Sequence, residues 1–201
     1  MTIDKIKYLS ELQSNFQKYA SITPESWLLI EAITEFQVVK KGSILLRNGE
    51  VAKELYFICK GILRAYITDK AGNIYNKNIF TEGSFAGSKA SSLQQSPSEF
   101  SIEALEDAIL IRIDYQKYRE LIFRQEDLKN FYIAYLEKNW VIEKEQREIS
   151  LVMENATERY LQLLSKHPDI ANRIPLLHIA SHLGITPTQL SRIRKSLEKD
   201  F

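Results

Sequence analysis

The sequence predicts an α+β protein in which a small β-barrel is followed by a long helix and a helical C-terminal unit. Apolar and polar residues alternate in short runs between residues 36 and 112, which is typical of strands in a barrel or sandwich. Residues 126–153 contain no proline or glycine and carry apolar residues at helical spacing. Residues 176–197 form two short amphipathic segments separated by a turn signal.

The composition is that of a globular protein with an uneven charge distribution. The chain has 201 residues and a net charge of +1. After residue 155 there are seven Lys or Arg against four Asp or Glu, whereas the remaining chain has 20 against 22. A basic end on a mildly acidic body suits a sensor joined to a nucleic-acid binder.

The chain lacks the residues that a disulfide, an iron–sulfur cluster or a membrane span would need. Cys59 is the only cysteine, which excludes an intrachain disulfide and a four-cysteine iron–sulfur site. No stretch approaches the apolar length of a membrane span, and the N-terminus has no apolar signal core. We therefore expect a cytoplasmic protein with no cofactor and no membrane partner.

The first 112 residues are expected to form two helices and then seven strands. Helices are predicted between residues 2 and 32, the second starting at Thr23 and Pro24. Lys60 and Gly61 interrupt a strand pair and indicate a bulge or a barrel corner. Residues 81–98 are small and polar, and fit a ligand-contacting helix and loop or a surface connection equally well. The expected strands are residues 36–39, 43–46, 55–60, 62–68, 75–80, 99–105 and 108–112.

The long helix carries a heptad-like stripe. Leu128, Tyr135, Ile142 and Ile149 are seven residues apart, a spacing that indicates pairing with a second copy of the chain. The alternative is a single helix buried along its own domain. A break near Asn155 then suggests three parts: a sensor over 1–125, a dimerisation helix and hinge over 126–154, and a helix-turn-helix over 155–201.

The C-terminal segments have the layout of a helix-turn-helix. Gly184 follows the first segment, where a left-handed residue is needed, and Thr186, Pro187 and Gln189 provide the N-cap, N1 and N3 residues of the second. Gln suits adenine and Arg suits guanine in the major groove, although an ordinary solvated helical hairpin is the alternative. The candidate DNA-binding residues are Thr186, Thr188, Gln189, Ser191, Arg192 and Lys195.

This order of parts resembles the Crp/Fnr superfamily of bacterial transcription regulators. The resemblance rests on Gly42, Gly49 and residues 55–64, 85–88, 97–104 and 157–160, together with the helix-turn-helix. It implies an N-terminal double-stranded β-helix (jelly-roll) barrel of the cyclic-nucleotide-binding type with flanking helices. It also implies a winged-helix-like C-terminal domain, whose wing should be minimal because the chain stops at Phe201.

The expected effector site departs from the pattern of relatives that bind cyclic AMP. Those relatives have a ribose-binding Glu where this chain has Ser88, and a phosphate-binding Arg where it has Ser98, next to Glu99. An anionic phosphate needs a cation or aligned amides, so we expect no cyclic AMP binding of the usual kind. The effector-pocket candidates are Phe85, Gly87, Ser88, Lys89, Ser98 and Glu99.

The sequence therefore predicts a homodimeric, sequence-specific DNA-binding regulator that is not an enzyme. Its expected partners are a pseudo-palindromic duplex, a second copy and an unknown small-molecule effector, with RNA polymerase a further candidate. The alternative is a small-molecule-binding barrel with a vestigial DNA-binding domain. A cupin-like metalloenzyme is disfavoured because no histidine precedes His167.

Overall fold

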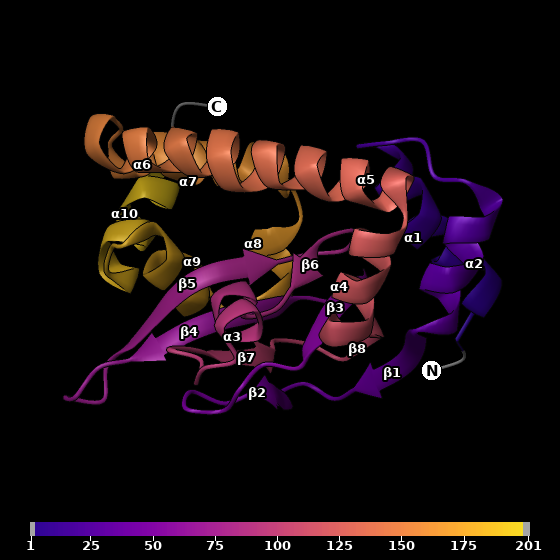
Figure 1. Ribbon diagram of the computed structural model, residues 1–201. Helices are drawn as coiled ribbons and strands as arrows, with labels where there is room; N and C mark the ends of the chain where they lie inside the picture. Colours follow the sequence, from indigo (N-terminus) through magenta and orange to yellow (C-terminus); the bar gives the residue numbers. More distant parts are fainter. Residues whose placement is uncertain (1–2, 199–201) are drawn as a thin grey trace.

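The computed structural model describes residues 3–198 and has an α+β architecture, in which a β-sandwich is flanked by helices (Figure 1). One antiparallel sheet has the strand order β1-β8-β3-β6 and the other β2-β7-β4-β5, which is the arrangement of an eight-stranded jelly roll. The first sheet contains β1 (Thr34–Val39), β8 (Ala108–Asp114), β3 (Glu54–Lys60) and β6 (Phe85–Ala86). The second contains β2 (Ile44–Leu46), β7 (Ser101–Ala104), β4 (Leu63–Thr68) and β5 (Ile74–Phe80).

Alternation along the strands divides the apolar residues between two cores. Ile58 and Leu110 point between the sheets, where they meet Leu63 and Ile102. Phe57, next to Ile58 in sequence, belongs to the other core, because successive strand residues face opposite sides. The first sheet is thus apolar on both faces and needs helices to cover its outer side.

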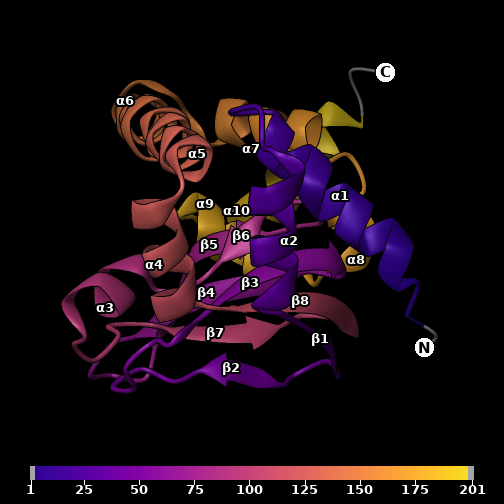
Figure 2. The same ribbon diagram turned by 45° about the vertical axis from the view of Figure 1, so that its right-hand side comes forward.

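Four helices provide that cover (Figure 2). They are α1 (Lys5–Gln17), α2 (Pro24–Ala32), α4 (Tyr115–Arg124) and α5 (Glu126–Leu136). Phe16 of α1 stacks on Phe131 of α5 with ring centroids 4.0 Å apart, and both side chains are almost completely buried. The N-terminal helices and α5 therefore share one core on the outside of the barrel.

The predicted irregularity at Lys60 and Gly61 is confirmed. The β3–β8 register shifts between Ile58 and Lys60, and Gly61 has a φ of +106°. A Cβ at Gly61 would lie 2.5 Å from the Cβ of Ala108, so both the conformation and the space require glycine here. The chain turns at this point from one sheet into the other.

The long helical segment contains an irregularity that the sequence did not predict. A π-helical segment, η1 (Glu137–Ile142), separates α5 from α6 (Glu143–Met153). The wider π turn shifts the heptad register between Leu128 and Ile149. Leu128 is fully buried in its own chain and Tyr135 packs against that core, whereas Ile142 and Ile149 are more than half exposed. The expectation of one continuous seam from Leu128 was therefore wrong.

The C-terminal unit is a group of four helices: α7 (Ala156–Lys166), α8 (Ile170–Arg173), α9 (Leu176–Leu183) and α10 (Pro187–Leu197). Asn155 caps α7 through a capping box with Glu158, which places the end of the long helix where the sequence indicated a hinge. The core of this unit includes Ile62 and Leu105 of the barrel, so the unit packs against the sandwich. Phe201, where the minimal wing was expected, lies outside the described residues.

No helix among residues 3–198 has the length and apolar character needed to cross a bilayer. The same residues contain no group of three or more His, Cys, Asp or Glu side chains placed to hold a metal ion. The sequence did not predict β6, α4 or α8, each of which is short or follows directly from its neighbour in sequence.

Candidate nucleic-acid interface and effector pockets

The turn between α9 and α10 has the left-handed glycine and the capping box that its residues predict. Gly184 is left-handed, with a φ of +71°, and the Ile185 amide donates to the Ala180 carbonyl at 3.0 Å. The Thr186 side chain then accepts from the Gln189 amide at 3.2 Å, while Gln189 Oε1 accepts from the Thr186 amide at 2.9 Å. Two backbone amides at the start of α10, which lack partners within the helix, are thus hydrogen-bonded by side chains of residues 186–189.

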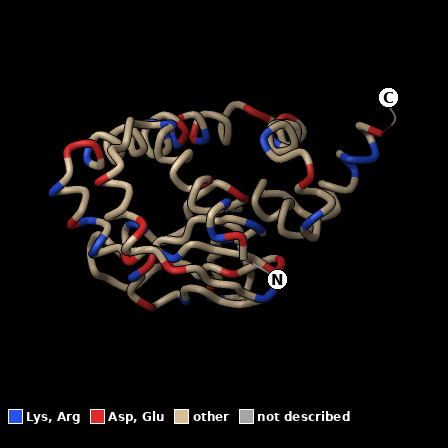
Figure 3. Tube along the Cα trace, turned by 90° about the vertical axis from the view of Figure 1, so that its right-hand side faces the viewer, with Lys and Arg blue, Asp and Glu red and all other residues tan. Residues whose placement is uncertain are grey.

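The second helix exposes a polar and basic face. Leu190 is fully buried in the C-terminal core, which turns the opposite side of α10 to solvent. Figure 3 shows Lys and Arg on the helix that leads to the C-terminus, on the outside of the molecule. All six candidate DNA-binding residues are exposed: Thr186, Thr188, Gln189, Ser191, Arg192 and Lys195.

Gln189 has a local role that competes with base recognition. Its side-chain oxygen is occupied by the Thr186 amide in the capping box. A bidentate contact with adenine uses both the oxygen and the nitrogen of a Gln side chain. The cap therefore competes with a base for the orientation of the Gln189 side chain, whereas Arg192 has no such local bond among the described contacts.

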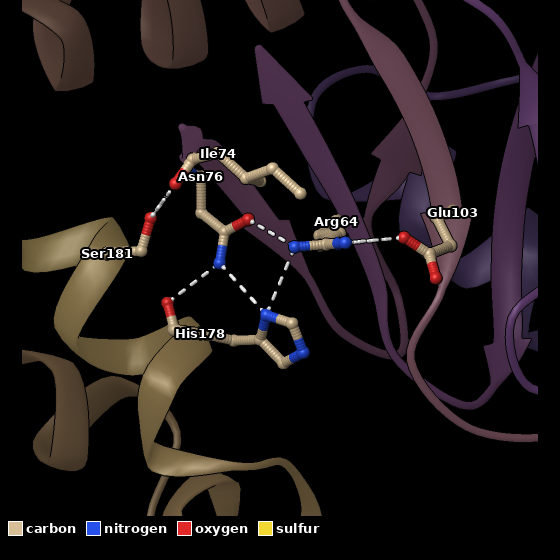
Figure 4. A network of polar contacts seen from close by, with 6 residues as sticks. All are labelled: Arg64, Ile74, Asn76, Glu103, His178 and Ser181. Atoms are coloured by element: carbon tan, nitrogen blue, oxygen red, sulfur yellow. Dashed lines mark hydrogen bonds and ion pairs between the residues drawn. The ribbon is translucent and has the colours of Figure 1, made fainter. Parts of the chain in front are cut away.

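A polar network joins α9 to the barrel (Figure 4). Arg64 of β4 is 8% exposed and donates to Glu103 of β7 through Nε at 3.0 Å and Nη2 at 2.6 Å. Its Nη1 lies 3.1 Å from Asn76 Oδ1 and 3.1 Å from His178 Nδ1. Asn76 Nδ2 donates to the His178 carbonyl at 2.9 Å. Residues from three strands of one sheet thus form the network that holds α9.

Two further contacts fix the C-terminal half on the sandwich. Arg173 of α8 forms ion pairs with Glu82 and Glu106, which lie in loops of the barrel. These bonds raise the pKa of the Arg173 guanidinium and lower the pKa of the Glu82 carboxyl. Arg147 of α6 donates to Asn78 Oδ1 at 2.7 Å and to the Lys77 carbonyl at 2.8 Å.

The six effector-pocket candidates do not meet in one cavity. Phe85 and Lys89 border a small cavity of about 20 Å³ outside the barrel, which is enough for about one water molecule. Lys89 Nζ donates to Tyr135 Oη at 3.1 Å and lies over the rings of Tyr135 and Trp140. Burial lowers the pKa of the Lys89 amine to about 7. This lysine faces an aromatic enclosure and does not replace a phosphate-binding arginine in the barrel.

The other four candidates are occupied by local structure or face solvent. Ser88 is buried at the start of α3 (Lys89–Gln94), and a Cβ on Gly87 would come 3.2 Å from Leu55 Cδ1. Ser98 Oγ donates to the Phe100 carbonyl at 2.8 Å. Glu99 is exposed to solvent.

A larger cavity of about 160 Å³ opens beside β2 and β3 and was missed from the sequence. It is bordered by Glu50, Lys53, Glu54 and Tyr56, together with apolar residues such as Ile102. Burial raises the pKa of the Glu54 carboxyl and raises that of the Tyr56 phenol to about 12. The strand alternation that directs Tyr56 inward was the available signal for this cavity.

The donor set does not fit a cyclic nucleotide. Two carboxylates and one lysine border the larger cavity, and Ser88 and Ser98 bring no positive charge. A cyclic phosphate is an anion that would need a cation or several aligned amides in this partly buried region. The side chains present therefore do not supply the cation that relatives use to bind the cyclic phosphate.

Comparison with known proteins defines the class. Residues 36–125 match the family described as cyclic nucleotide-binding domain. The chain is 26% identical over 167 residues to the cAMP-activated global transcriptional regulator CRP of Pasteurella multocida, which covers 78% of this chain and 79% of the relative. The barrel is thus a cyclic-nucleotide-binding-type domain in a chain that is similar to a transcription regulator over most of its length.

Solved structures share the fold. FixK2 from Bradyrhizobium japonicum superposes with a TM-score of 0.70 at 15% identity, covering 84% of this chain and 86% of that one. The c-di-GMP-responsive regulator CLP of Xanthomonas campestris gives a TM-score of 0.66 at 16% identity, covering 89% and 93%. Together these similarities support a relationship between this chain and the regulators of the Crp/Fnr superfamily.

Proposed function

We propose that this protein is a sequence-specific regulator that binds double-stranded DNA through α10. The observation that carries the proposal is the left-handed Gly184 turn followed by a capped helix whose exposed face presents Arg192 and Lys195. A helix with one buried apolar side and a free polar N-terminal half fits the major groove. The first helix of such a motif crosses the phosphate backbone, which is the place of α9.

The protein acts as a dimer in this proposal. Exposed apolar side chains lie along η1 and α6. They include Ile142, Ile149 and Val152, and Val152 is 83% exposed. A row of this kind is costly in water and is typical of a helix that pairs with a second copy. Two recognition helices about 34 Å apart would then match a pseudo-palindromic site.

Selection of duplexes from a random pool tests the DNA-binding proposal. We expect one symmetric sequence to be enriched, with binding that weakens steeply as salt rises, because phosphate contacts release counterions. Arg192→Ala should lose about 1–3 kcal/mol at one base pair. Arg124→Ala, an exposed arginine on α4 far from α10 in the fold, is the matched control and should bind as the native chain does.

The outcomes of this experiment separate the two functions. Equal loss on every sequence would give Arg192 a phosphate role rather than a base-reading role. If no duplex is enriched at low salt while a small molecule from cell extract fills the larger cavity, the protein is a small-molecule-binding module instead.

The dimer is tested by the mass of the native assembly in solution. Ile149→Glu should convert a dimer to a monomer, because it places a charge in the proposed contact. Leu28→Glu is the matched control, since Leu28 is 65% exposed on α2 and lies outside the proposed seam. A monomeric native chain, or equal effects of both substitutions, would refute the dimer.

The effector of the barrel is not cyclic AMP in this proposal. Cyclic AMP at millimolar concentration should leave the melting temperature unchanged, because a ligand stabilises only the state that binds it. A rise in melting temperature that depends on the cyclic AMP concentration would contradict this expectation.

A further inference from the structure

The contact between α9 and the barrel covers an open sheet edge. β5 is the end strand of its sheet, so its outward amides and carbonyls have no neighbouring strand. The Asn76 amide donates to Ser181 Oγ at 2.8 Å, and Ser181 Oγ donates to the Ile74 carbonyl at 3.3 Å (Figure 4). One serine of α9 therefore satisfies two backbone groups of the edge.

The protonation state of His178 follows from its partners. A guanidinium has only donors, and Arg64 Nη1 lies 3.1 Å from His178 Nδ1. The amide nitrogen of Asn76, also a donor, lies 3.4 Å from the same atom. Nδ1 must accept in this arrangement, so the ring is neutral and carries its proton on Nε2.

Protonation of Nδ1 would turn this attraction into repulsion. The new N–H would face two donors, and the imidazolium would lie beside the Arg64 guanidinium. The charged groups around the ring are Arg64 from β4, Glu103 from β7 and Lys41 from the loop before β2. Glu103 already accepts two bonds from Arg64 and only partly offsets the added charge. Burial, followed by the Arg64 charge, lowers the pKa of the His178 imidazole below its ordinary value.

Docking also occupies the polar side of α9. His178 and Ser181 lie on the side of the helix that contacts β5, while the apolar Ile179 and Leu183 face the C-terminal core. A first helix that crosses DNA uses its polar residues on phosphates. In the docked helix the side chains of His178 and Ser181 are instead hydrogen-bonded to the barrel.

We propose that the contact of His178 and Ser181 with Arg64 and Asn76 is a proton-sensitive latch, which holds the helix-turn-helix on the barrel while His178 is neutral and releases it when His178 is protonated. The consequence for DNA affinity rests on the proposed function, whereas the latch itself does not. The docked state is favoured above the ordinary histidine pKa near 6.5, and this advantage is lost as the pH falls, because the released state binds the extra proton.

Hydrogen exchange of the Asn76 amide tests the latch without DNA. This amide faces away from the sheet and is protected by Ser181, so its exchange reports release of α9. After correction for the intrinsic rate, His178 alone should lower protection about tenfold from pH 7.5 to 5.5, since a released imidazole is about nine-tenths protonated at pH 5.5. The amides of central strand β8 should keep their protection, which shows that the barrel stays folded.

Two substitutions make the result specific. His178→Asn keeps an acceptor near the position of Nδ1 without a titrating group, and should remove the share of the acid dependence that His178 contributes. The share that remains belongs to His182 on the same helix, where burial lowers the pKa of the imidazole to about 4. His178→Lys places a permanent charge there and should open the latch at both pH values. His167→Gln is the matched control, because His167 pairs with Thr81 at a separate contact and should retain the native acid response.

Equal acid dependence in the native chain and His178→Asn would overturn the latch, as would full protection of Asn76 at both pH values. DNA affinity should rise as the pH falls over the same range, and the rise should be smaller in His178→Asn than in the native chain. An open latch at acid pH with no affinity for any duplex would refute the proposed function and leave the latch standing.

Discussion

Substitution of Gly184 tests whether the turn between α9 and α10 determines the position of α10, the helix proposed to contact DNA. Gly184 has a φ of +71°, and a Cβ placed there would contact nothing within 4 Å. The cost of Gly184→Ala is therefore a backbone cost alone, which is about 1–2 kcal/mol for an L-residue in the left-handed region. In a chain of this size such a loss lowers the melting temperature by roughly 2–8 °C. Gly184→Val should cost more, because β-branched residues resist positive φ.

The assay combines thermal unfolding with affinity for the selected duplex. Gly72→Ala is the matched control, since Gly72 has a φ of +86° with nothing within 4 Å of its Cβ and lies in the β4–β5 loop. Both substitutions should lower stability by a similar amount, but only those at Gly184 should weaken DNA binding at a temperature where the chain is folded. Gly184→Asn should be milder, because Asn tolerates the left-handed region. Native DNA affinity in Gly184→Val, with the chain folded, would refute the reasoning.

Three further substitutions have expected outcomes in stability assays. Gly61→Ala should cost more than Gly184→Ala in denaturant unfolding, because it adds a contact of 2.5 Å with Ala108 Cβ to the backbone strain; an equal cost would contradict this. Lys89→Met should raise the melting temperature most at and below pH 7 and progressively less up to pH 10. The reason is that burial lowers the pKa of the Lys89 amine to about 7, so the penalty for charging it in the folded state disappears as the pH approaches the ordinary lysine pKa. A constant difference between pH 7 and pH 10 would show that burial of charge is not the cause. Glu103→Gln should cost roughly 3–5 kcal/mol in denaturant unfolding, because it leaves the buried Arg64 guanidinium without its counter-charge, and a cost below about 1 kcal/mol would show that solvent screens the pair.

The local elements were largely predictable because their causes lie within a few residues. Asn155 begins α7 by its side-chain bonds to nearby amides, and Thr186 begins α10 in the same way. The alternation between residues 36 and 112 located seven of the eight strands found in residues 3–198, since strand burial has a period of two. The two-residue β6 was missed because it is too short to show any period.

The long helix shows where periodicity alone fails. Leu128, Tyr135, Ile142 and Ile149 keep a heptad spacing, but the π segment between them rotates the later residues away from the earlier ones. Packing of Leu128 and Phe131 on the barrel determines the first half, and the second half is left with exposed apolar residues. The sequence identified an apolar stripe without showing that it divides between two surfaces.

The proposed DNA-binding face and the effector pocket also differ in how far the sequence alone predicted them. The exposed face of α10 followed from the position of Leu190, because one helix turn defines both faces. The effector pocket did not follow, since Phe85 and Lys89 share a short segment with Ser88 yet face an aromatic cavity outside the barrel. Residues close in sequence on a strand end and a helix start need not face the same space.

By itself the sequence determined the caps, the left-handed turn at Gly184 and the alternation of the strands, because these depend on backbone conformation and on neighbours a few positions away. Only the tertiary structure decided that Arg64 meets His178 across 114 residues, and that the Lys89 amine lies over the Tyr135 ring and not in the barrel. Such pairs depend on how whole elements pack, and packing sums many weak contacts that no local pattern records.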